Sequence, residues 1–251
     1  LHPQAQQKLY SQISSFSGQK IISTHSPSIV SQANLSELIH FEKKHGKTIV
    51  NRFDNSIYDV EEKNRIKREV IASHGDLLFS RAIVLCEGIT EEQALPIYFE
   101  KYYGVNPSFW GISIIGIGGQ NYKTFLSLIR DFNIDWYIFS DGEDSTIKTV
   151  KKAVEKVFSL DISNCNNVII LDNKEDFEKH LINSGYVSEI VEAICDYEEN
   201  PDYIAEFIRT RDQKSDGRRR TNLPKCPSCN QDIYEDIIKD YSGTEGYNRA
   251  V

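Results

Sequence analysis

The sequence of 251 residues has no methionine, only two tryptophans and only five cysteines. It also lacks long apolar runs: residues 136–139 and 168–171, among the longest, are far shorter than the ~20 residues that a membrane-spanning helix requires. No basic segment followed by an apolar one resembles a signal peptide, and the cysteines form no regular disulfide framework. We therefore expect no membrane segment and a reducing, cytoplasmic setting. The missing methionine and the first residue, Leu1, favour a piece of a longer protein.

The charge balance is negative overall, with a net charge of −8 at pH 7. Such a chain is a poor match for nucleic acid, because binding to phosphates relies on clustered lysine and arginine. The distribution is uneven, however, and residues 209–225 contain seven basic residues against two aspartates. The basic residues are Arg209, Arg211, Lys214, Arg218, Arg219, Arg220 and Lys225. We expect the stretch from Arg209 to Arg220 either to hold DNA phosphates or to form a solvated, flexible loop.

The first part of the chain shows several short patterns. A helix at the start is followed by a short strand over residues 19–24, which would present His25 at its carboxyl edge. Residues 38–58 predict short strands around a turn at Gly46. The many charged residues of segment 59–78 predict a solvent-facing connecting helix. These elements would precede the main domain.

From Ser80 onward, continuous apolar segments alternate with amphipathic ones. The expected strands are residues 82–86, 112–117, 136–140 and 167–171, and the expected helices are residues 91–103, 121–132 and 145–158. This alternation predicts an α/β fold, in which a mainly parallel sheet is covered by helices on both faces. Because ligands bind beyond the carboxyl ends of the strands in such sheets, the residues that follow each strand are the place to look for chemistry.

Acidic residues follow three of these four strands. Glu87 and Glu91 lie at the start of the first helix, Asp141 and Glu143 flank a glycine after the third strand, and residues 172–178 follow the fourth. Carboxylates that converge from separate strands repel one another unless a cation lies between them, and hard oxygen ligands suit Mg²⁺ or Mn²⁺. Helix capping is the simpler explanation for Glu91 taken alone. Glu87 and Asp141 together favour a metal site.

Cys226 and Cys229 have the spacing of half a zinc site, because two intervening residues let both thiolates reach one tetrahedral ion. The other two ligands would have to come from Cys195, His180 or another subunit, since no second pair with this spacing exists in the sequence. A reduced pair of cysteines in a turn is the default expectation, and Zn²⁺ is the alternative.

Two segments at the strand ends resemble the signature of Toprim domains. Residues 82–91, AIVLCEGITE, carry an EG-containing motif, and residues 139–143, FSDGE, resemble the DxD motif that follows about fifty residues later. Among Toprim proteins the chain most resembles the OLD (overcoming lysogenization defect) family of endonucleases and, within it, the nucleases of Gabija antiphage systems. The metal-binding and catalytic carboxylates that this resemblance implies are Glu87, Glu91, Asp141 and Glu143, with Asp176 and Glu178 as further metal ligands from another acidic motif.

The resemblance also implies an architecture. The start of the chain and the STHSP stretch at residues 23–27 resemble the end of an ABC-type ATPase domain, in which His25 matches the switch histidine. The phosphate-cradling G-x-x-x-x-G-K-[ST] loop is missing from the sequence, so His25 is expected to be inactive here and ATP to bind only the full-length protein. The expected domains are residues 1–79 (carboxyl-terminal part of the ATPase domain and linker), 80–185 (Toprim nuclease core) and 186–251 (helical, partly basic extension with the CxxC pair).

Two departures from the family pattern bear on the expected mechanism. Glu143 stands where the second aspartate of DxD is usual, and Lys214 is the candidate for a catalytic lysine unless that residue lies beyond Val251. The implied reaction is divalent-metal-dependent hydrolysis of double-stranded DNA in antiphage defence, by a homo-oligomer with a UvrD-like helicase partner. The alternatives are a topoisomerase- or primase-like Toprim protein and a non-catalytic regulatory or assembly domain.

Overall fold

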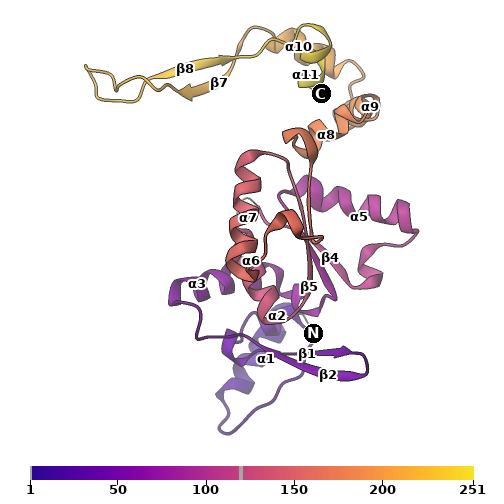
Figure 1. Ribbon diagram of the computed structural model, residues 1–251, viewed down its shortest axis with the longest axis vertical. Coiled ribbons are helices and arrows are strands. Elements are labelled where there is room, and N and C mark those ends of the chain that lie inside the picture. The colour runs from indigo at the N-terminus through magenta and orange to yellow at the C-terminus, as the bar shows by residue number, and fades with distance from the viewer. Residues whose placement is uncertain (1, 119–120) are drawn as a thin grey trace. The chain divides into compact units, whose positions relative to one another are not determined.

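The computed structural model describes residues 2–118 and 121–251 and divides the chain into two compact units. The first unit ends at Asp176 and the second begins at Phe177. Each unit has its own strands and helices (Figure 1). Within these described ranges, no helix is both long enough and apolar enough to cross a membrane.

A four-stranded parallel sheet forms the centre of the first unit. Its strands are β3 (Ala82–Cys86), β4 (Ile112–Gly116), β5 (Asp135–Ser140) and β6 (Val168–Ile170), in the spatial order β4-β3-β5-β6. β3 therefore lies between two partners, and its residues Ile83, Leu85 and Cys86 are fully buried. A strand needs such continuous apolar sequence when helices cover both faces of its sheet. The predicted α/β fold with a mainly parallel sheet is confirmed.

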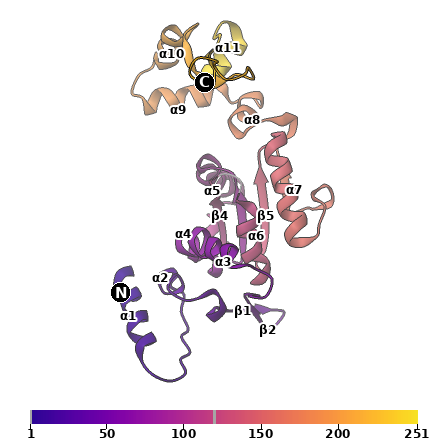
Figure 2. The same ribbon diagram turned by 90° about the vertical axis from the view of Figure 1, so that its left-hand side faces the viewer.

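Three longer helices connect the strands and cover the sheet. They are α5 (Ile89–Tyr103), α6 (Tyr122–Asp131) and α7 (Asp144–Phe158), and the 3₁₀ turns η4 (Pro107–Trp110), η5 (Ile162–Asn164) and η6 (Asp172–Lys174) complete the connections. Val150, Val154 and Val157 recur on α7 at the spacing of one helical face, and all three are buried. α6 packs against α7, and Figures 1 and 2 show α7 and α5 on opposite sides of strands β4 and β5.

The amino-terminal segment matches the sequence predictions only in part. It contains α1 (Pro3–Ser15), α2 (Pro27–Val30), η1 (Leu35–Glu37) and the antiparallel hairpin of β1 (Ile39–Lys44) and β2 (Lys47–Arg52). The hairpin turn confirms the strands predicted around Gly46, because His45 and Gly46 have φ values of 50° and 76°, as a two-residue type I′ turn requires. The strand predicted over residues 19–24 is wrong: these residues have no regular secondary structure. A strand forms only when its backbone groups find a partner strand, and no described strand pairs with them.

A nearly continuous helical segment leads into the sheet. It comprises α3 (Val60–Arg65), the π-helical η2 (Ile66–Ile71), α4 (Ala72–His74) and the 3₁₀ turn η3 (Gly75–Phe79). The predicted helix is confirmed, but its solvent-facing character is wrong. Ile66, Val70 and Leu77 are at most 2% exposed and belong to the hydrophobic core, where η2 packs on α6. Charged residues surround these buried positions, so composition alone overestimated the exposure of the segment.

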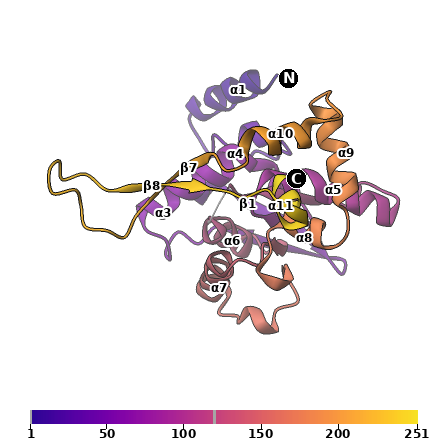
Figure 3. The same ribbon diagram turned by 90° about the horizontal axis from the view of Figure 1, so that it is seen from above.

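The second unit combines four helices with a hairpin. The helices are α8 (Phe177–Asn183), α9 (Val187–Tyr197), α10 (Tyr203–Arg211) and α11 (Gly243–Ala250). Between α10 and α11 the chain forms an antiparallel hairpin of β7 (Ser215–Arg220) and β8 (Tyr234–Ile238). Figures 1 and 3 show this hairpin extending away from the helices of the unit. The expectation of a helical extension missed this hairpin, and the basic stretch after Lys214 is a paired strand, not a flexible loop.

Candidate metal centre at the carboxyl edge of the sheet

Glu87 and Asp141 lie at the same edge of the sheet. Glu87 directly follows β3, and Asp141 directly follows β5. These two strands are hydrogen-bonded neighbours, with Leu85 opposite Ile138, and adjacent strands are about 4.8 Å apart. The strand order therefore brings together two carboxylates that are distant in sequence.

The surroundings of Glu87 disfavour its negative charge. Its Oε2 atom is buried and has no hydrogen-bond partner among the described residues. Burial is the main cause that raises the pKa of Glu87, and the negative charges of Glu91 and Glu143 raise it further. The Thr146 hydroxyl, which is within hydrogen-bonding reach, acts in the opposite direction. A cation at this position would offset both the burial of the charge and the repulsion between the carboxylates.

Glu91 is held by the backbone of its own helix. Its residue surface is only 5% exposed, and its Oε2 accepts a hydrogen bond from the N–H of Gly88, the N-cap residue of α5, at 3.0 Å. This contact is the helix-capping role that the sequence position favours for Glu91 taken alone. The charge of Glu91 still raises the pKa of Glu87, so Glu91 acts on the site while one of its oxygens is engaged.

Glu143 is the exposed N-cap residue of α7 and accepts a hydrogen bond from the Ser145 hydroxyl at 3.4 Å. The next residue, Asp144, forms a 2.8 Å ion pair with Lys174, and this contact lowers the pKa of Asp144. Lys174 follows β6 in the left-handed backbone region, with a φ of 60°. The structure thus places a lysine at the acidic edge, whereas sequence reasoning looked for one later in the chain. Its position just after the fourth strand was the available signal.

Two glycines determine how closely the loops at this edge approach one another. A Cβ on Gly142 would lie 2.3 Å from the Leu171 carbonyl oxygen, and one on Gly116 would lie 2.7 Å from the Gly88 carbonyl oxygen. Both distances are too short for any side chain, so these positions require glycine. The Gly142 N–H also donates to the Glu175 carbonyl at 2.8 Å, which ties the loop after β5 to the loop after β6.

Tyr122 belongs to this site but was missed by sequence reasoning. It begins α6, it is fully buried, and its hydroxyl has no hydrogen-bond partner in the described part of the chain. Burial is the main cause that raises the pKa of Tyr122, and the charges of Glu87 and Asp141 add to it. The nearby Ser140 hydroxyl, which lowers that pKa, donates its own hydrogen to the Asp141 carbonyl at 3.3 Å. A tyrosine at the start of an amphipathic helix gives no sequence signal for such a site.

Residues 2–118 and 121–251 contain no group of three or more His, Cys, Asp or Glu side chains placed to hold a metal ion unaided. Asp176 is a half-buried residue of the first unit, and Glu178 is an exposed residue of α8 in the second. The sheet edge itself offers Glu87 and Asp141. One or two carboxylates are enough for Mg²⁺, which keeps several waters and takes further oxygens from substrate phosphates. The donor chemistry and the buried Glu87 oxygen therefore fit such an ion.

Residues 78–142, which include β3, β4, β5 and both carboxylates, match the family model described as Overcoming lysogenization defect protein-like, TOPRIM domain. This segment is therefore similar to OLD-like Toprim domains. Endonuclease GajA of Bacillus cereus (strain HuB5-5) is 23% identical to the chain over 275 residues. That match covers 88% of the chain and 40% of the relative, so the chain spans less than half the length of that protein. The resemblance of the Toprim domain to the OLD family is confirmed.

Two solved structures of OLD proteins are also similar to parts of the chain. The C-terminal region of the Xanthomonas campestris pv. campestris OLD protein matches with a TM-score of 0.40 and 20% identity, over 48% of this chain and 62% of that one. The C-terminal region of the Burkholderia pseudomallei OLD protein matches with a TM-score of 0.37 and 18% identity, over 55% of this chain and 68% of that one. Both similarities are too low to transfer a residue's role to the Toprim domain.

The predicted DNA-contacting residues lie outside the Toprim domain, on α10 and the β7–β8 hairpin. Arg209, Arg211 and Lys214 are exposed, and the Arg211 guanidinium lies 5.2 Å from the ring centre of Phe207. The three arginines of β7 form ion pairs with acidic residues across the hairpin: Arg218 with Asp236, Arg219 with Glu235 and Arg220 with Asp232. Residues 215–238 contain four basic and four acidic residues, so the opposing residues cancel the positive charge that the sequence concentrates here.

The remaining predicted site residues, His25, Cys226 and Cys229, belong to segments of the chain that do not form the acidic edge. His25 is exposed in the segment before α2, and its ring packs against Phe79 with centroids 5.4 Å apart. Cys226 and Cys229 lie in the loop that joins β7 to β8. Glu87 and Asp141, the carboxylates of the Toprim domain, are in other segments, after β3 and β5.

Proposed function

We propose that this chain carries the catalytic part of a divalent-metal-dependent DNA endonuclease. The OLD-like Toprim domain and the endonuclease relative support a nuclease in general. One observation supports the metal-dependent step: the Oε2 atom of Glu87 is buried and has no hydrogen-bond partner in the described part of the chain, at the strand edge that Glu87 shares with Asp141. In this proposal the substrate is double-stranded DNA, and the reaction is hydrolysis of a phosphodiester.

The residues at the edge of the sheet have distinct roles in the proposal. Glu87 and Asp141 hold Mg²⁺ or Mn²⁺, and Glu143 reaches toward the same site from the start of α7. When bound, the ion polarises the phosphodiester and makes a bound water more acidic. Glu91 positions the first turn of α5 through Gly88 and adds negative charge that attracts the cation. Asp176 and Glu178 are proposed to support a second ion.

The wider assignments are proposals of the same kind. Residues 1–79 would be the end of an ABC-type ATPase domain, residues 80–185 the Toprim nuclease core and residues 186–251 the partly basic extension. ATP would act on the full-length protein through the rest of that ATPase domain. From the resemblance to Gabija nucleases we further propose antiphage defence in the cytoplasm, a homo-oligomer and a UvrD-like helicase partner.

Plasmid nicking in Mg²⁺ or Mn²⁺, with and without EDTA, tests the metal role directly. Glu87→Gln and Asp141→Asn should each lower the nicking rate by about 100-fold or more. Mutation of a residue that only hydrogen-bonds to a metal ligand typically lowers activity by about 10- to 100-fold, and loss of the ligand itself should have at least as large an effect. Glu155→Gln on the exposed face of α7 and Asp135→Asn at the opposite end of β5 are matched controls that should keep wild-type rates. Wild-type nicking by Glu87→Gln, or nicking that survives EDTA, would contradict the proposal.

Thermal unfolding gives a second readout that does not depend on catalysis. Mg²⁺ or Mn²⁺ should raise the Tm of the wild-type chain and leave that of Glu87→Gln unchanged. An ion stabilises a folded protein only if the folded protein binds it. Without metal, Glu87→Gln should unfold at a higher temperature than wild type. The raised pKa of Glu87 means that folding disfavours its charged form, and glutamine removes that charge. An equal metal-induced shift in both proteins would show that the ion binds elsewhere.

A further inference from the structure

The loop that joins β7 to β8 folds into a tight turn around its two cysteines. The Asn230 N–H donates to the Cys226 carbonyl at 2.8 Å, and the Cys226 N–H donates to the Gln231 carbonyl at 2.9 Å. Asn230 has a φ of 55°, the left-handed conformation that asparagine tolerates in turns. These contacts hold residues 226–231 in one compact reversal, with both cysteines inside it.

Backbone N–H groups of the same turn lie near the Cys226 sulfur. The backbone N–H groups of Ser228 and Cys229 lower the pKa of Cys226, in that order of effect, and the Cys229 thiol adds to them. The two thiols of this turn lie close enough to interact with each other, and thiolates are the form in which cysteines bind metal ions. Redox-active pairs with this spacing gain much of their acidity from a helix N-terminus, but here residues 221–233 form a loop between two strands.

We propose that Cys226 and Cys229 form one half of a tetrahedral Zn²⁺ site, and that the same two cysteines of a second copy of the chain complete it. Structural zinc is almost always held by four ligands, and two residues between cysteines is the spacing that lets both thiolates reach one ion. A two-fold axis through the ion would relate the pairs, as in most homodimers.

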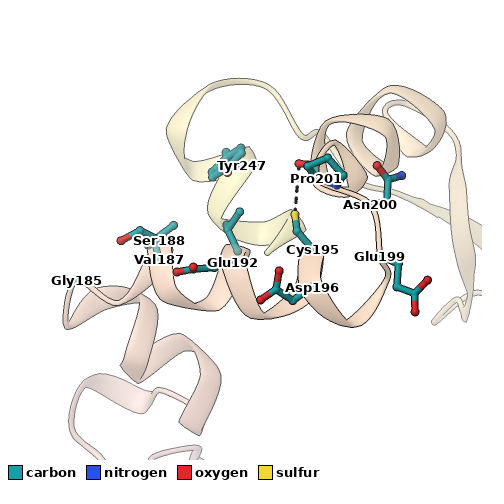
Figure 4. A pocket seen from close by; sticks show the side chains of 11 residues that line it. Gly185, Val187, Ser188, Glu192, Cys195, Asp196, Glu199, Asn200, Pro201 and Tyr247 are labelled. Atoms are coloured by element: carbon teal, nitrogen blue, oxygen red, sulfur yellow. Dashed lines mark hydrogen bonds between the residues drawn. The ribbon is translucent and has the colours of Figure 1, made fainter.

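Within the second unit, the described residues do not supply the missing ligands. No group of three or more possible metal ligands forms among them. Cys195 lines a cleft of about 790 Å³ beside α9 and α11, and its thiol donates to the Pro201 carbonyl at 3.5 Å (Figure 4). The hairpin leads away from these helices (Figures 1 and 3), so the helices of its own unit do not surround its loop.

The charges on the hairpin suit a contact between two copies. Residues 215–238 contain equal numbers of basic and acidic residues, and the three arginines of β7 are in ion pairs, so two hairpins can approach without strong repulsion. One Zn²⁺ with four thiolates carries two negative charges. Lys225, directly before Cys226, places one of the positive charges of each hairpin beside the ion.

Titration of the reduced 251-residue chain with Zn²⁺ alone tests this site. We expect about one ion per two chains, the ratio that four shared thiolates require, together with a zinc-dependent change from monomer to dimer in sedimentation or light scattering. Co²⁺ in place of Zn²⁺ should give the charge-transfer and d–d absorption bands of a four-thiolate site. Cys226→Ser/Cys229→Ser should lose binding, bands and dimer, whereas Cys195→Ser should keep all three.

Three results would overturn the proposal: no zinc binding by the reduced chain at micromolar concentration, full binding by Cys226→Ser/Cys229→Ser, or one ion per chain without dimer formation. Both cysteines lie in a surface loop, and circular dichroism of each variant establishes that it is folded. The zinc site does not depend on the nuclease proposal. Glu87→Gln should bind zinc like wild type, and Cys226→Ser/Cys229→Ser should retain the metal-dependent stabilisation of the Toprim domain.

Discussion

On the β7–β8 hairpin the three arginines of β7 form ion pairs with acidic residues of β8 and of the loop before it, whereas at the carboxyl edge of the Toprim sheet the charge of Glu87 lies near other negative charges. Arg218 and Arg219 are exposed and paired with Asp236 and Glu235. At the sheet edge, Glu87 has a buried oxygen without a hydrogen-bond partner among the described residues, and burial, then the charges of Glu91 and Glu143, raise its pKa. The arginines of the hairpin are paired within the fold, whereas the surroundings of Glu87 disfavour its charge.

This difference separates charge that stabilises the fold from charge that serves a site. Exposed ion pairs contribute about 0 to 1 kcal/mol each, because water screens them and their side chains lose freedom. A partly buried charge beside like charges is costly unless something compensates it. In the sequence, the densest group of basic residues lies on the hairpin and suggests a binding site there. In the structure, the charge that its surroundings disfavour is that of Glu87, in the Toprim domain.

The largest change in stability should come from a substitution at the sheet edge, where the loops approach one another closely. Gly142→Ala would place a Cβ 2.3 Å from the Leu171 carbonyl oxygen, and we expect a loss of about 3 kcal/mol in the free energy of unfolding. Urea unfolding followed by tryptophan fluorescence measures it, since Trp110 and Trp136 both lie in the first unit. Gly75→Ala is the control, because a Cβ there makes ordinary contacts with Pro27. Equal stability of the two variants would show that the loops need not approach so closely.

A smaller effect should come from Tyr122. Tyr122→Phe removes a buried hydroxyl that has no hydrogen-bond partner in the described residues, so the metal-free protein should gain about 1 kcal/mol. If the hydroxyl serves the bound ion or its water, the affinity for Mn²⁺ should fall by about 10-fold or more. Calorimetric titration and urea unfolding measure the two effects.

Tyr58→Phe is the matched control for Tyr122. The Tyr58 hydroxyl donates to the Ser127 carbonyl at 3.1 Å and accepts from Arg130 at 2.8 Å, so its removal should cost about 1 kcal/mol and leave Mn²⁺ affinity unchanged. The same sign of stability change in both variants would remove the distinction between the two buried hydroxyls.

The smallest effect on stability should come from the hairpin arginines. Replacing Arg218, Arg219 and Arg220 with glutamine should cost no more than about 1 kcal/mol per ion pair. If these arginines also contact DNA, the salt dependence of binding should flatten by about 0.9 in log–log slope for each lost phosphate contact. The control removes as many positive charges elsewhere, at Lys8, Lys47 and Lys101, which are exposed. An unchanged slope in the arginine variant would exclude the hairpin from the DNA path.

The sheet and its flanking helices could be predicted because their signals are local. Strands β3 to β6 are continuous apolar segments, and α7 repeats valines at helical spacing. The strand over residues 19–24 failed for the opposite reason, since pairing depends on a partner that no local pattern specifies. The charged segment before the sheet was misjudged because Ile66 and Val70 are buried by contacts with distant residues.

The sequence by itself determined the order of strands and helices, the carboxylates after β3 and β5, and the resemblance to the OLD-like Toprim domain. Each of these depends on residues within a few positions of one another. The tertiary structure decided which strands are neighbours, and therefore that Glu87 and Asp141 share one edge with Tyr122 and Lys174. It also decided that the arginines of β7 are neutralised across the hairpin. Electrostatic interactions depend on distances in space, which local sequence patterns do not contain.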